Sequence, residues 1–565
     1  MPRRLLLLFL AILGLLLGPA HAQSPADNRY VTGATALRVD PVATDLEQRT
    51  TTLDVRWDAS WRDAENGDAA WIVLKGRHAD GTHVPLSIRP RPVVVENRSS
   101  DGAAAAFEVP GDRIGMFIHR AAPGEGDNRW RVRVPWSQTS SDGGAVESVV
   151  ALGVEMVYVP TGDFQLGTVR SLRDRAVPTT RGSGTAPINA LFRADPEGED
   201  RFGGPYPVTS EAPIEIGPAR GQLYYIDAEI TGVDTYSGDQ TGTLAAGFPK
   251  GYQGFYQMKY EVTEQQYVAM LNLLSPDQAQ RRYDLSVRES GRPPAAYRHT
   301  IDYEDGRYRT RRPQRAANFL SWTDALAWAD WMGLRPMTGL EFEKSARGPE
   351  APAFREFVWG VSEIDSPEHY RVDRRILDPD GTLAGGENGD ERVDGNVHVL
   401  MLHYDSAKDV CRPDGPNYRP GHYGCRTFEG GDGGRGPLQV GIHGVRSGGD
   451  RVAAGASYYG AMELGGNLHE QVVTLGHPQG RAFRGTHGDG RLTPAGDATN
   501  ADWRPDAENH VFAYRGGSWR AHENHARTAD RFYGFEQGGT VRASTNGFRA
   551  VRTAHSGATT TSQPN

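Results

Sequence analysis

The chain has 565 residues, which is too long for one ordinary hydrophobic core, so we expect two or more domains. Its formal net charge of −9 argues against nucleic acid as a partner. The 69 glycines, many of them in stretches shared with aspartate and proline, predict much loop and little regular structure.

Residues 1–22 have the pattern of a signal peptide. Arg3 and Arg4 precede an apolar run over 5–17, and a cleavage site of the A-x-A type ends at Ala22. The apolar run of about 13 residues is shorter than the roughly 18–20 that a membrane-spanning helix needs, and no later segment is apolar enough to cross a bilayer. We therefore expect an exported protein, periplasmic or extracellular, with no transmembrane segment.

Residues 28–150 have the pattern of a small antiparallel β-sandwich domain. Apolar and polar residues alternate in two segments, as they do in half-buried strands. The apolar positions of these segments are Leu53, Val55, Trp57, Trp130, Val132 and Val134. Residues 69–77 form a more continuous apolar strand. Modules of this kind usually bind a ligand or act as spacers between domains, and they seldom carry a catalytic site.

From about residue 151 the pattern changes to a loop-rich body. Residues 153–168 predict a pair of strands that turn at Thr161-Gly162. Two helices are predicted, one over 263–274 with Thr263 as N-cap and one over 321–333 with Gly333 as C-cap. Tryptophans in the second helix have the spacing of packing residues. The polar tail over 554–565 is expected to be disordered.

The chain has two cysteines, Cys411 and Cys425, in a stretch rich in glycine and proline. In an exported protein a disulfide is the favoured interpretation. It would close a loop of about 15 residues and stabilise the fold by roughly 3 kcal/mol in the chain-entropy model. The alternative is a catalytic pair, although free thiols would soon be linked in an oxidising compartment.

Seven stretches, in order along about 400 residues, resemble the formylglycine-generating enzyme (sulfatase-modifying factor) family. They are "MVYVPTGDFQLG" (156–167), "YEVTEQQYVAML" (260–271), "NFLSWTDALAWADWMGLRPMTGLEFEKSARG" (318–348), "VWG" (358–360), "ELGGNLHE" (463–470), "YRGGSW" (514–519) and "NGFRAVR" (546–552). The resemblance implies that 151–553 forms an α+β, C-type-lectin-like domain with little regular secondary structure.

The resemblance also implies where chemistry would occur. In the oxygen-dependent enzymes of this family, two cysteines that follow the Gly-Gly-Ser-aromatic turn bind copper(I), for which soft thiolates are suited. In this sequence those positions are Ala521 and Ala526. Alanine offers no metal ligand, nucleophile or redox chemistry. We therefore expect no copper and no formylglycine formation by the family's mechanism.

The same loop offers other polar side chains. His522 and His525 form an H-x-x-H pair that could bind a divalent metal if a third ligand such as Asp530, Glu523 or His510 converged on it. Alternatively, both histidines are exposed polar side chains. A groove for an anionic group could be lined by Arg515, Trp519, His522, His525, Arg527, Arg531 and Arg549. Equally, the arginines could pair with carboxylates as structural residues.

The resemblance implies two structural calcium sites made of side-chain and backbone oxygens. The ligands of one site match Glu463, the carbonyls of Gly466 and Leu468, and Glu470. The other site would use Asn417 and Asp432 with the carbonyls of Tyr418 and Gly434. The alternative for the first site is that Glu463 and Glu470 only face solvent.

Three functions follow for testing. The first is a calcium-stabilised scaffold without catalysis, which binds a protein or glycan ligand in the cell envelope or outside the cell. The second is an enzyme with another metal-dependent oxidation on the same fold. The third is formylglycine generation on a sulfatase cysteine. Family membership by itself does not decide between them.

Overall fold

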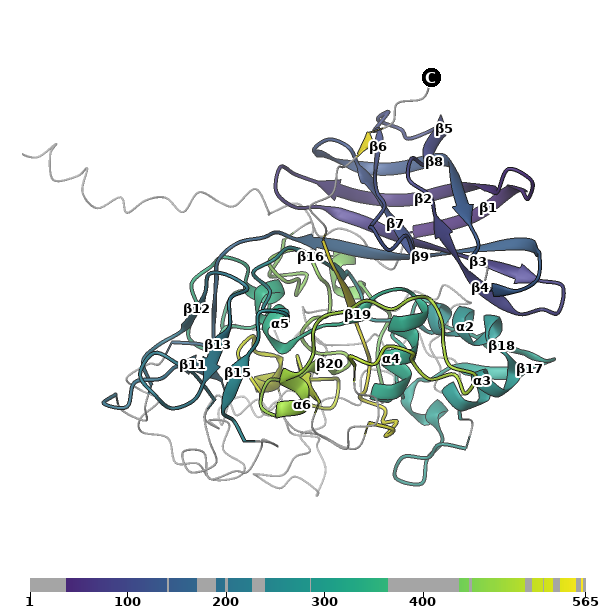
Figure 1. Cartoon of the computed structure of the whole chain (residues 1–565). Coiled ribbons are helices and arrows are strands. Elements are labelled where there is room, and N and C mark those ends of the chain that lie inside the picture. Colours follow the sequence, from purple (N-terminus) through teal and green to yellow (C-terminus); the bar gives the residue numbers. More distant parts are fainter. Residues whose placement is uncertain are drawn as a thin grey trace, which may run out of the picture.

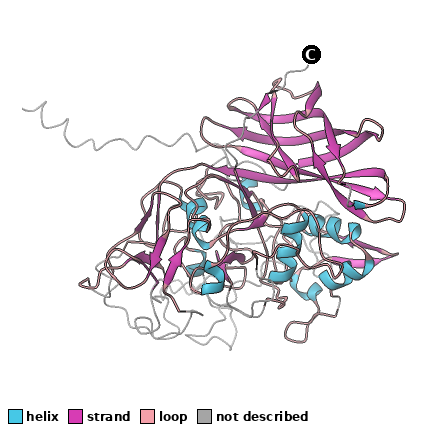
Figure 2. Ribbon diagram, viewed as in Figure 1, coloured by secondary structure: helices cyan, strands magenta, loops and turns pink. Residues whose placement is uncertain are grey.

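The computed structural model describes residues 37–139, 142–169, 190–198, 202–225, 239–284, 286–363, 436–446, 450–503, 511–521, 523–531, 539–554 and 560–561. In these residues strands and loops predominate, helices are few and short, and nearly all strand pairs are antiparallel (Figures 1 and 2). An N-terminal group of strands lies against a body that carries the helices (Figure 1).

The N-terminal strands form two antiparallel layers. They are β1 (Leu37–Asp45), β2 (Thr50–Arg62), β3 (Asp68–His78), β4 (His83–Ile88), β5 (Val93–Asn97), β6 (Ala105–Glu108), β7 (Gly115–Arg120), β8 (Gly124–Ser137) and β9 (Val146–Val159). The outer layer has the order β1-β2-β8-β5. The inner layer is built on β3, which pairs with β9, β7 and β4. The predicted alternation is confirmed, since Trp57 and Trp130 are buried between the layers.

Strand β3 contributes to two hydrophobic cores. Ala70, Ile72 and Leu74 pack in the core of the N-terminal layers. The alternate residues, such as Trp71 and Val73, pack in the core of the body. A strand that is buried on both faces has a continuous apolar sequence, which explains the run over 69–77.

The N-terminal layers continue into the body through β9. Its partners are β3 on one edge and β16 (Phe255–Met258) on the other, and β16 continues through β22 (Ala550–Thr553) to β19 (Arg335–Pro336). The boundary expected at 150–151 therefore falls inside one strand. The strand pair predicted over 153–168 is wrong, because both edges of β9 are occupied and β10 (Phe164–Leu166) pairs with β12 (Tyr206–Val208) instead.

The remaining described elements belong mostly to the body. The strands are β11 (Leu191–Arg193), β13 (Ile214–Ile216), β14 (Leu223–Tyr225), β15 (Gly242–Leu244), β17 (Ile301–Glu304), β18 (Arg307–Thr310), β20 (Glu470–Val473), β21 (Phe512–Arg515) and β23 (Thr560–Thr561). The α-helices are α2 (Glu264–Leu273), α3 (Pro276–Arg282), α4 (Trp322–Trp331), α5 (Gly339–Arg347) and α6 (Pro478–Arg481). Strand β23 pairs with β6 of the N-terminal strands.

Both predicted helices are present. Thr263 caps α2 and Ser321 caps α4, each with a reciprocal side-chain bond to the third residue of the helix. Gly333 follows α4 with φ of 67°, the left-handed conformation that ends helices. Helix α5 was not predicted, although Thr338 and Glu341 form the same kind of cap.

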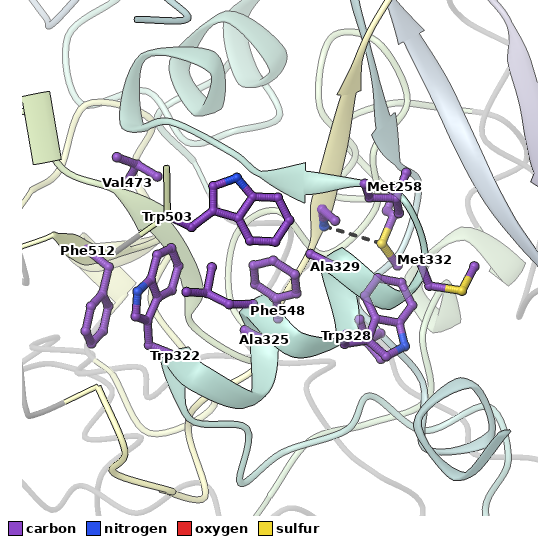
Figure 3. Close-up of a cluster of buried hydrophobic side chains, with 14 of the residues drawn as sticks. Met258, Trp322, Ala325, Trp328, Ala329, Met332, Val473, Trp503, Phe512 and Phe548 are labelled. Atoms are coloured by element: carbon purple, nitrogen blue, oxygen red, sulfur yellow. Dashed lines mark hydrogen bonds between the residues drawn. The ribbon is translucent and has the colours of Figure 1, made fainter. Parts of the chain in front are cut away.

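Helix α4 lies in the main core of the body (Figure 3). The ring of Trp322 stacks on Phe512 with centroids 5.0 Å apart, and Trp328 meets Phe548 edge to face. Both indoles are almost completely buried, with 1% exposure each. This confirms that these tryptophans pack rather than present a binding surface. Within the described residues, no helix has the length and apolar character to cross a membrane.

Candidate functional site

The loop after β21, in which the family's copper ligands would lie, is joined to the predicted calcium segment 463–470. Strand β20 begins at Glu470, whose register partner on β21 is Arg515. The amide of Gly466 donates to the carbonyl of Gly516 at 2.7 Å, and the amide of Trp519 donates to the carbonyl of Asn467 at 2.8 Å. The two segments therefore form one site.

Both copper-ligand positions are closed. Ala521 is 4% exposed and Ala526 is fully buried. Ala526 belongs to a hydrophobic cluster with Phe357, Val358 and Leu464. A methyl group in such surroundings contributes packing only, so the alanines supply no ligand for a soft metal.

A basic cluster, defined as Glu343 with Arg347, Arg515 and Arg531, lies beneath this loop. Arg531 donates to Glu343 Oε1 at 2.8 Å, and Arg515 donates to the same atom at 3.4 Å. Arg347 lies 3.5 Å from Oε2, which also accepts the amide of Gly167 at 2.7 Å. Burial alone would raise the pKa of Glu343, but the three guanidinium groups hold it below its ordinary value.

Backbone carbonyls, and for Arg347 also the carboxylate of Glu356, accept the hydrogen bonds that Glu343 leaves over. Arg515 donates to Thr528 O at 2.6 Å, and both Arg515 and Arg531 donate to Gly339 O. Arg347 donates to the carbonyls of residues 165 and 167. Arg515 and Arg531 are only 2% and 3% exposed, so this geometry fits the structural alternative for these arginines.

Arg527 and Trp519 of the predicted groove are also buried. Arg527 donates to Asn524 Oδ1 at 3.1 Å and lies 4.4 Å above the ring of Phe357. The indole of Trp519 donates to Ser544 O at 3.0 Å. These side chains fix the loop to the body.

An acidic cluster, defined as Glu261, Glu463 and Glu470 with Arg549, lies beneath segment 463–470. The guanidinium of Arg549 is fully buried and donates from Nε to Glu470 Oε1 at 2.7 Å. Its other hydrogens go to the carbonyls of residues 258, 259 and 462. Three buried carboxyl groups thus share one cation.

The two other carboxyl groups hold the backbone of this segment. Both oxygens of Glu463 accept the amide of Gly441 at 2.9 Å. Glu261 accepts the amide of Leu468 at 2.9 Å and the side-chain amide of Asn467. Burial, together with Glu470, raises the pKa of Glu463 to about 7, and burial raises the pKa of Glu261 well above its ordinary value.

Glu261 was missed at the sequence level, although it lies in the quoted stretch "YEVT". The available signal was a carboxylate flanked by apolar residues, immediately before the helix cap Thr263. Such a residue is almost never fully buried unless it has a partner.

The oxygen atoms available in segment 463–470 are of the types that bind calcium. Glu470 Oε2 is buried and has no hydrogen-bond partner. Among the described residues, no donor bonds to the carbonyls of Gly466 or Leu468. Carboxylate and carbonyl oxygens are the ligands that this hard cation takes. Within the same residues no three His, Cys, Asp or Glu side chains are grouped as a metal site, so the set depends on backbone oxygens.

Several predicted site residues lie outside the described residues. They are Asn417, Tyr418, Asp432 and Gly434 of the second calcium site, the cysteines Cys411 and Cys425, and His510 and His522. The second calcium site and the disulfide stay predictions.

His525 is oriented by a neighbouring carboxylate. Its Nδ1 lies 3.1 Å from Asp530 Oδ1, and the two side chains are 14% and 10% exposed. The ring of His469 stacks on Tyr514. Burial and, to a lesser extent, the nearby His525 lower the pKa of His469 to about 3. The pairing of His525 with Asp530 was anticipated only as a possible metal-ligand set.

Comparison with known proteins supports one assignment. Residues 233–380 match the model of the sulfatase-modifying factor enzyme 1-like domain, FGE-sulfatase. This range contains the motifs at 260–271, 318–348 and 358–360, while those at 463–470 and 514–519 lie beyond it. No curated protein matches the chain. Residues 233–380 are therefore similar to the sulfatase-modifying factor enzyme 1-like domain, in agreement with the resemblance found in the sequence motifs.

Proposed function

We propose that this protein is an exported member of its family that works as a calcium-stabilised scaffold and does not generate formylglycine. The scaffold would bind a protein or glycan ligand in the cell envelope or outside the cell, on a body with the C-type-lectin-like fold. Calcium would be its structural ion, and copper would have no role.

The observation that carries the proposal is the pair of buried alanines, Ala521 and Ala526, at the copper-ligand positions. Copper(I) needs soft donors, and oxygen activation in the family depends on that ion. The loop keeps its frame without them, because Arg515, Trp519 and Arg531 bind it to the body through buried hydrogen bonds.

The acidic cluster supports the calcium part of the proposal. Glu261, Glu463 and Glu470 bury three carboxyl groups around one guanidinium, and Glu470 retains an oxygen without a donor. Burying a charge is costly unless it is paired or coordinates a metal. Bound calcium would neutralise this excess, while Glu463 and Glu261 would keep the backbone of 463–470 in place.

The test of the catalytic part is incubation of the mature protein with a sulfatase-type peptide, with and without copper. We expect no aldehyde by mass spectrometry in either case. A copper-dependent aldehyde product would contradict the proposal and show that the loop has been aligned wrongly.

One observation favours an enzyme as the second candidate. His525 is partly exposed and is oriented by Asp530, an arrangement that can hold and move a proton. Metal analysis separates the candidates: copper or iron in stoichiometric amount, lost on His525→Ala, would favour the enzyme. Calcium alone, unchanged in His525→Ala, would favour the scaffold.

A further inference from the structure

The outer face of the N-terminal outer layer has two parts with different charge patterns. In one part, at Arg98, Arg129 and Arg131, the arginines have carboxylate partners. Arg131 donates to Asp54 at 2.7 Å and to Glu96 at 3.2 Å. Arg98 donates to Glu96 at 2.6 Å, and Arg129 pairs with a neighbouring aspartate. This part is a neutralised, solvated surface, for which arginines and acids in register are typical.

The other part, the basic corner, is defined by Arg49, Arg89, Arg91 and Arg133. All four are exposed, and none forms an ion pair with a described residue. The strand register places them together. Arg133 on β8 lies between Thr52 of β2 and Val93 of β5.

The basic corner also includes a turn next to β5. Arg89 donates to the carbonyls of Gln48 and Arg49 at 3.2 and 3.4 Å, which ties the β1–β2 turn to the segment before β5. Asp45 and Glu47 are the acids of this turn, and Asp45 is engaged by the amide of Gln48. Positive charge therefore exceeds negative charge at the corner.

Exposed aliphatic side chains surround the basic corner. Leu46 in the turn is 42% exposed, and Val93 on β5 is 45% exposed. Val95 and Val42 are 37% and 47% exposed on the same outer layer. These four are most of the large apolar side chains that are exposed among the described residues. The outer layer is the layer of the N-terminal strands that lies away from the body (Figure 1).

Unpaired arginines and exposed aliphatic side chains in one place match the chemistry of an anionic phospholipid surface. Arginines near such a surface gain about 1 kcal/mol each from the anionic headgroups. Short apolar side chains gain by entering the boundary between headgroups and acyl chains. A sulfated or carboxylated glycan would offer nothing to the valines. Protein hot spots are enriched in tryptophan and tyrosine as well as arginine, and the corner has the arginines without either aromatic residue.

We propose that the basic corner docks this protein onto an anionic phospholipid membrane, with the body held away from the bilayer. The net charge of −9 repels an anionic surface, so this orientation is required for binding. Added salt weakens the attraction. The proposal does not depend on the function of the family domain.

The test uses the mature chain and vesicles of phosphatidylcholine, with or without phosphatidylglycerol, in a flotation assay at low salt. The main variant is Arg49→Gly with Arg91→Gly. These two residues have φ of 53° and 72°, a conformation that glycine adopts without strain, so the fold should be kept or improved. The control is Arg307→Ser with Arg309→Ser, which removes the same charge from the exposed β17–β18 hairpin.

Wild type and control should bind vesicles that contain phosphatidylglycerol and ignore those that do not. The main variant should bind about 30-fold more weakly, from two arginines at about 1 kcal/mol each. Failure of the wild type to bind, equal binding to both vesicles, or equal losses in variant and control would overturn the proposal. Binding to a sulfated polysaccharide but not to vesicles, weakened by the same variant, would assign the corner to a glycan instead.

Discussion

The basic and acidic clusters are buried in the same part of the body and have opposite imbalances of charge. The two clusters adjoin, because Arg515 of the basic cluster on β21 is the register partner of Glu470 of the acidic cluster on β20. In the basic cluster Glu343 contacts three guanidinium groups, of which Arg347 also pairs with Glu356. In the acidic cluster the one guanidinium, that of Arg549, bonds Glu470 alone of the three carboxyl groups. The arginines and the carboxylates find their remaining hydrogen-bond partners in different ways.

Excess arginines are satisfied by the protein itself, because each carries several donors and carbonyl oxygens are abundant in loops. Carbonyls at 339 and 528 accept from the basic cluster. Excess carboxylates need donors, and Glu470 Oε2 has none. The comparison teaches that the basic cluster holds the loop without an anion, whereas the acidic cluster requires a cation or a proton.

The largest effect is expected from removing the carboxylate of the basic cluster. Glu343→Gln removes the carboxylate that the buried Arg515 and Arg531 contact, and breaking a buried pair in this way costs about 3–5 kcal/mol. Denaturant unfolding should show this loss equally in calcium and in chelator. A loss that appears only in calcium would mean that the clusters are one unit.

The effect of pH on this loss follows from the lowered pKa of Glu343. The stability that the carboxylate supplies is fully present above its unfolded value, near 4.5, and is lost as pH falls through the lower folded value. The difference between wild type and Glu343→Gln should therefore be constant from neutral pH down to about 4.5, and should shrink as pH falls from there through the lower folded value. A difference that already shrinks at pH 6 would show that the pKa is raised instead.

The acidic cluster should respond in the opposite way to loss of charge. Glu470→Gln keeps an oxygen for Arg549 but removes one buried negative charge. In chelator it should cost little stability, because it reduces the excess of carboxylates. In calcium it should forfeit the stabilisation by bound ion, about 2.7 kcal/mol at a hundredfold excess over the dissociation constant. Equal losses in both conditions would mean that the residue acts only through its bond to Arg549.

The smallest effect is expected from restoring a cysteine. Ala526→Cys adds one sulfur atom to a fully buried position, and overpacking of this kind costs typically about 1–3 kcal/mol. Ala521→Cys, at a slightly exposed position, should cost less. Thermal melting of the two single variants tests this order. A stabilised Ala526→Cys would show that the site keeps room for a thiol.

The parts of the fold that could be predicted were those with a local signal. The N-cap Thr263 and the C-cap Gly333 located α2 and α4, and alternation around Trp57 and Trp130 located the half-buried strands. The strand pair over 153–168 was wrong because its partners are distant in sequence. Strand β9 pairs with residues that begin at 68 and 255, and no local pattern specifies such pairing.

The site was predictable to a similar extent. The motifs identified Ala521, Ala526, Glu463 and Glu470 by position. They did not show that Arg515, Arg531 and Arg549 are buried, because the local sequence around an arginine does not distinguish one that lines a groove from one that lies in the core. Glu261, between β16 and α2, and Glu343, in α5, were missed because each reaches its partners only through the tertiary fold.

The central claim is that the acidic cluster binds a cation, and the most direct measurement is calcium binding to chelator-treated mature protein by titration calorimetry. We predict that calcium binds to wild type and to Glu343→Gln, and that Glu470→Gln binds one ion fewer per chain. Equal stoichiometry in wild type and Glu470→Gln, or no calcium bound by the wild type, would contradict the account.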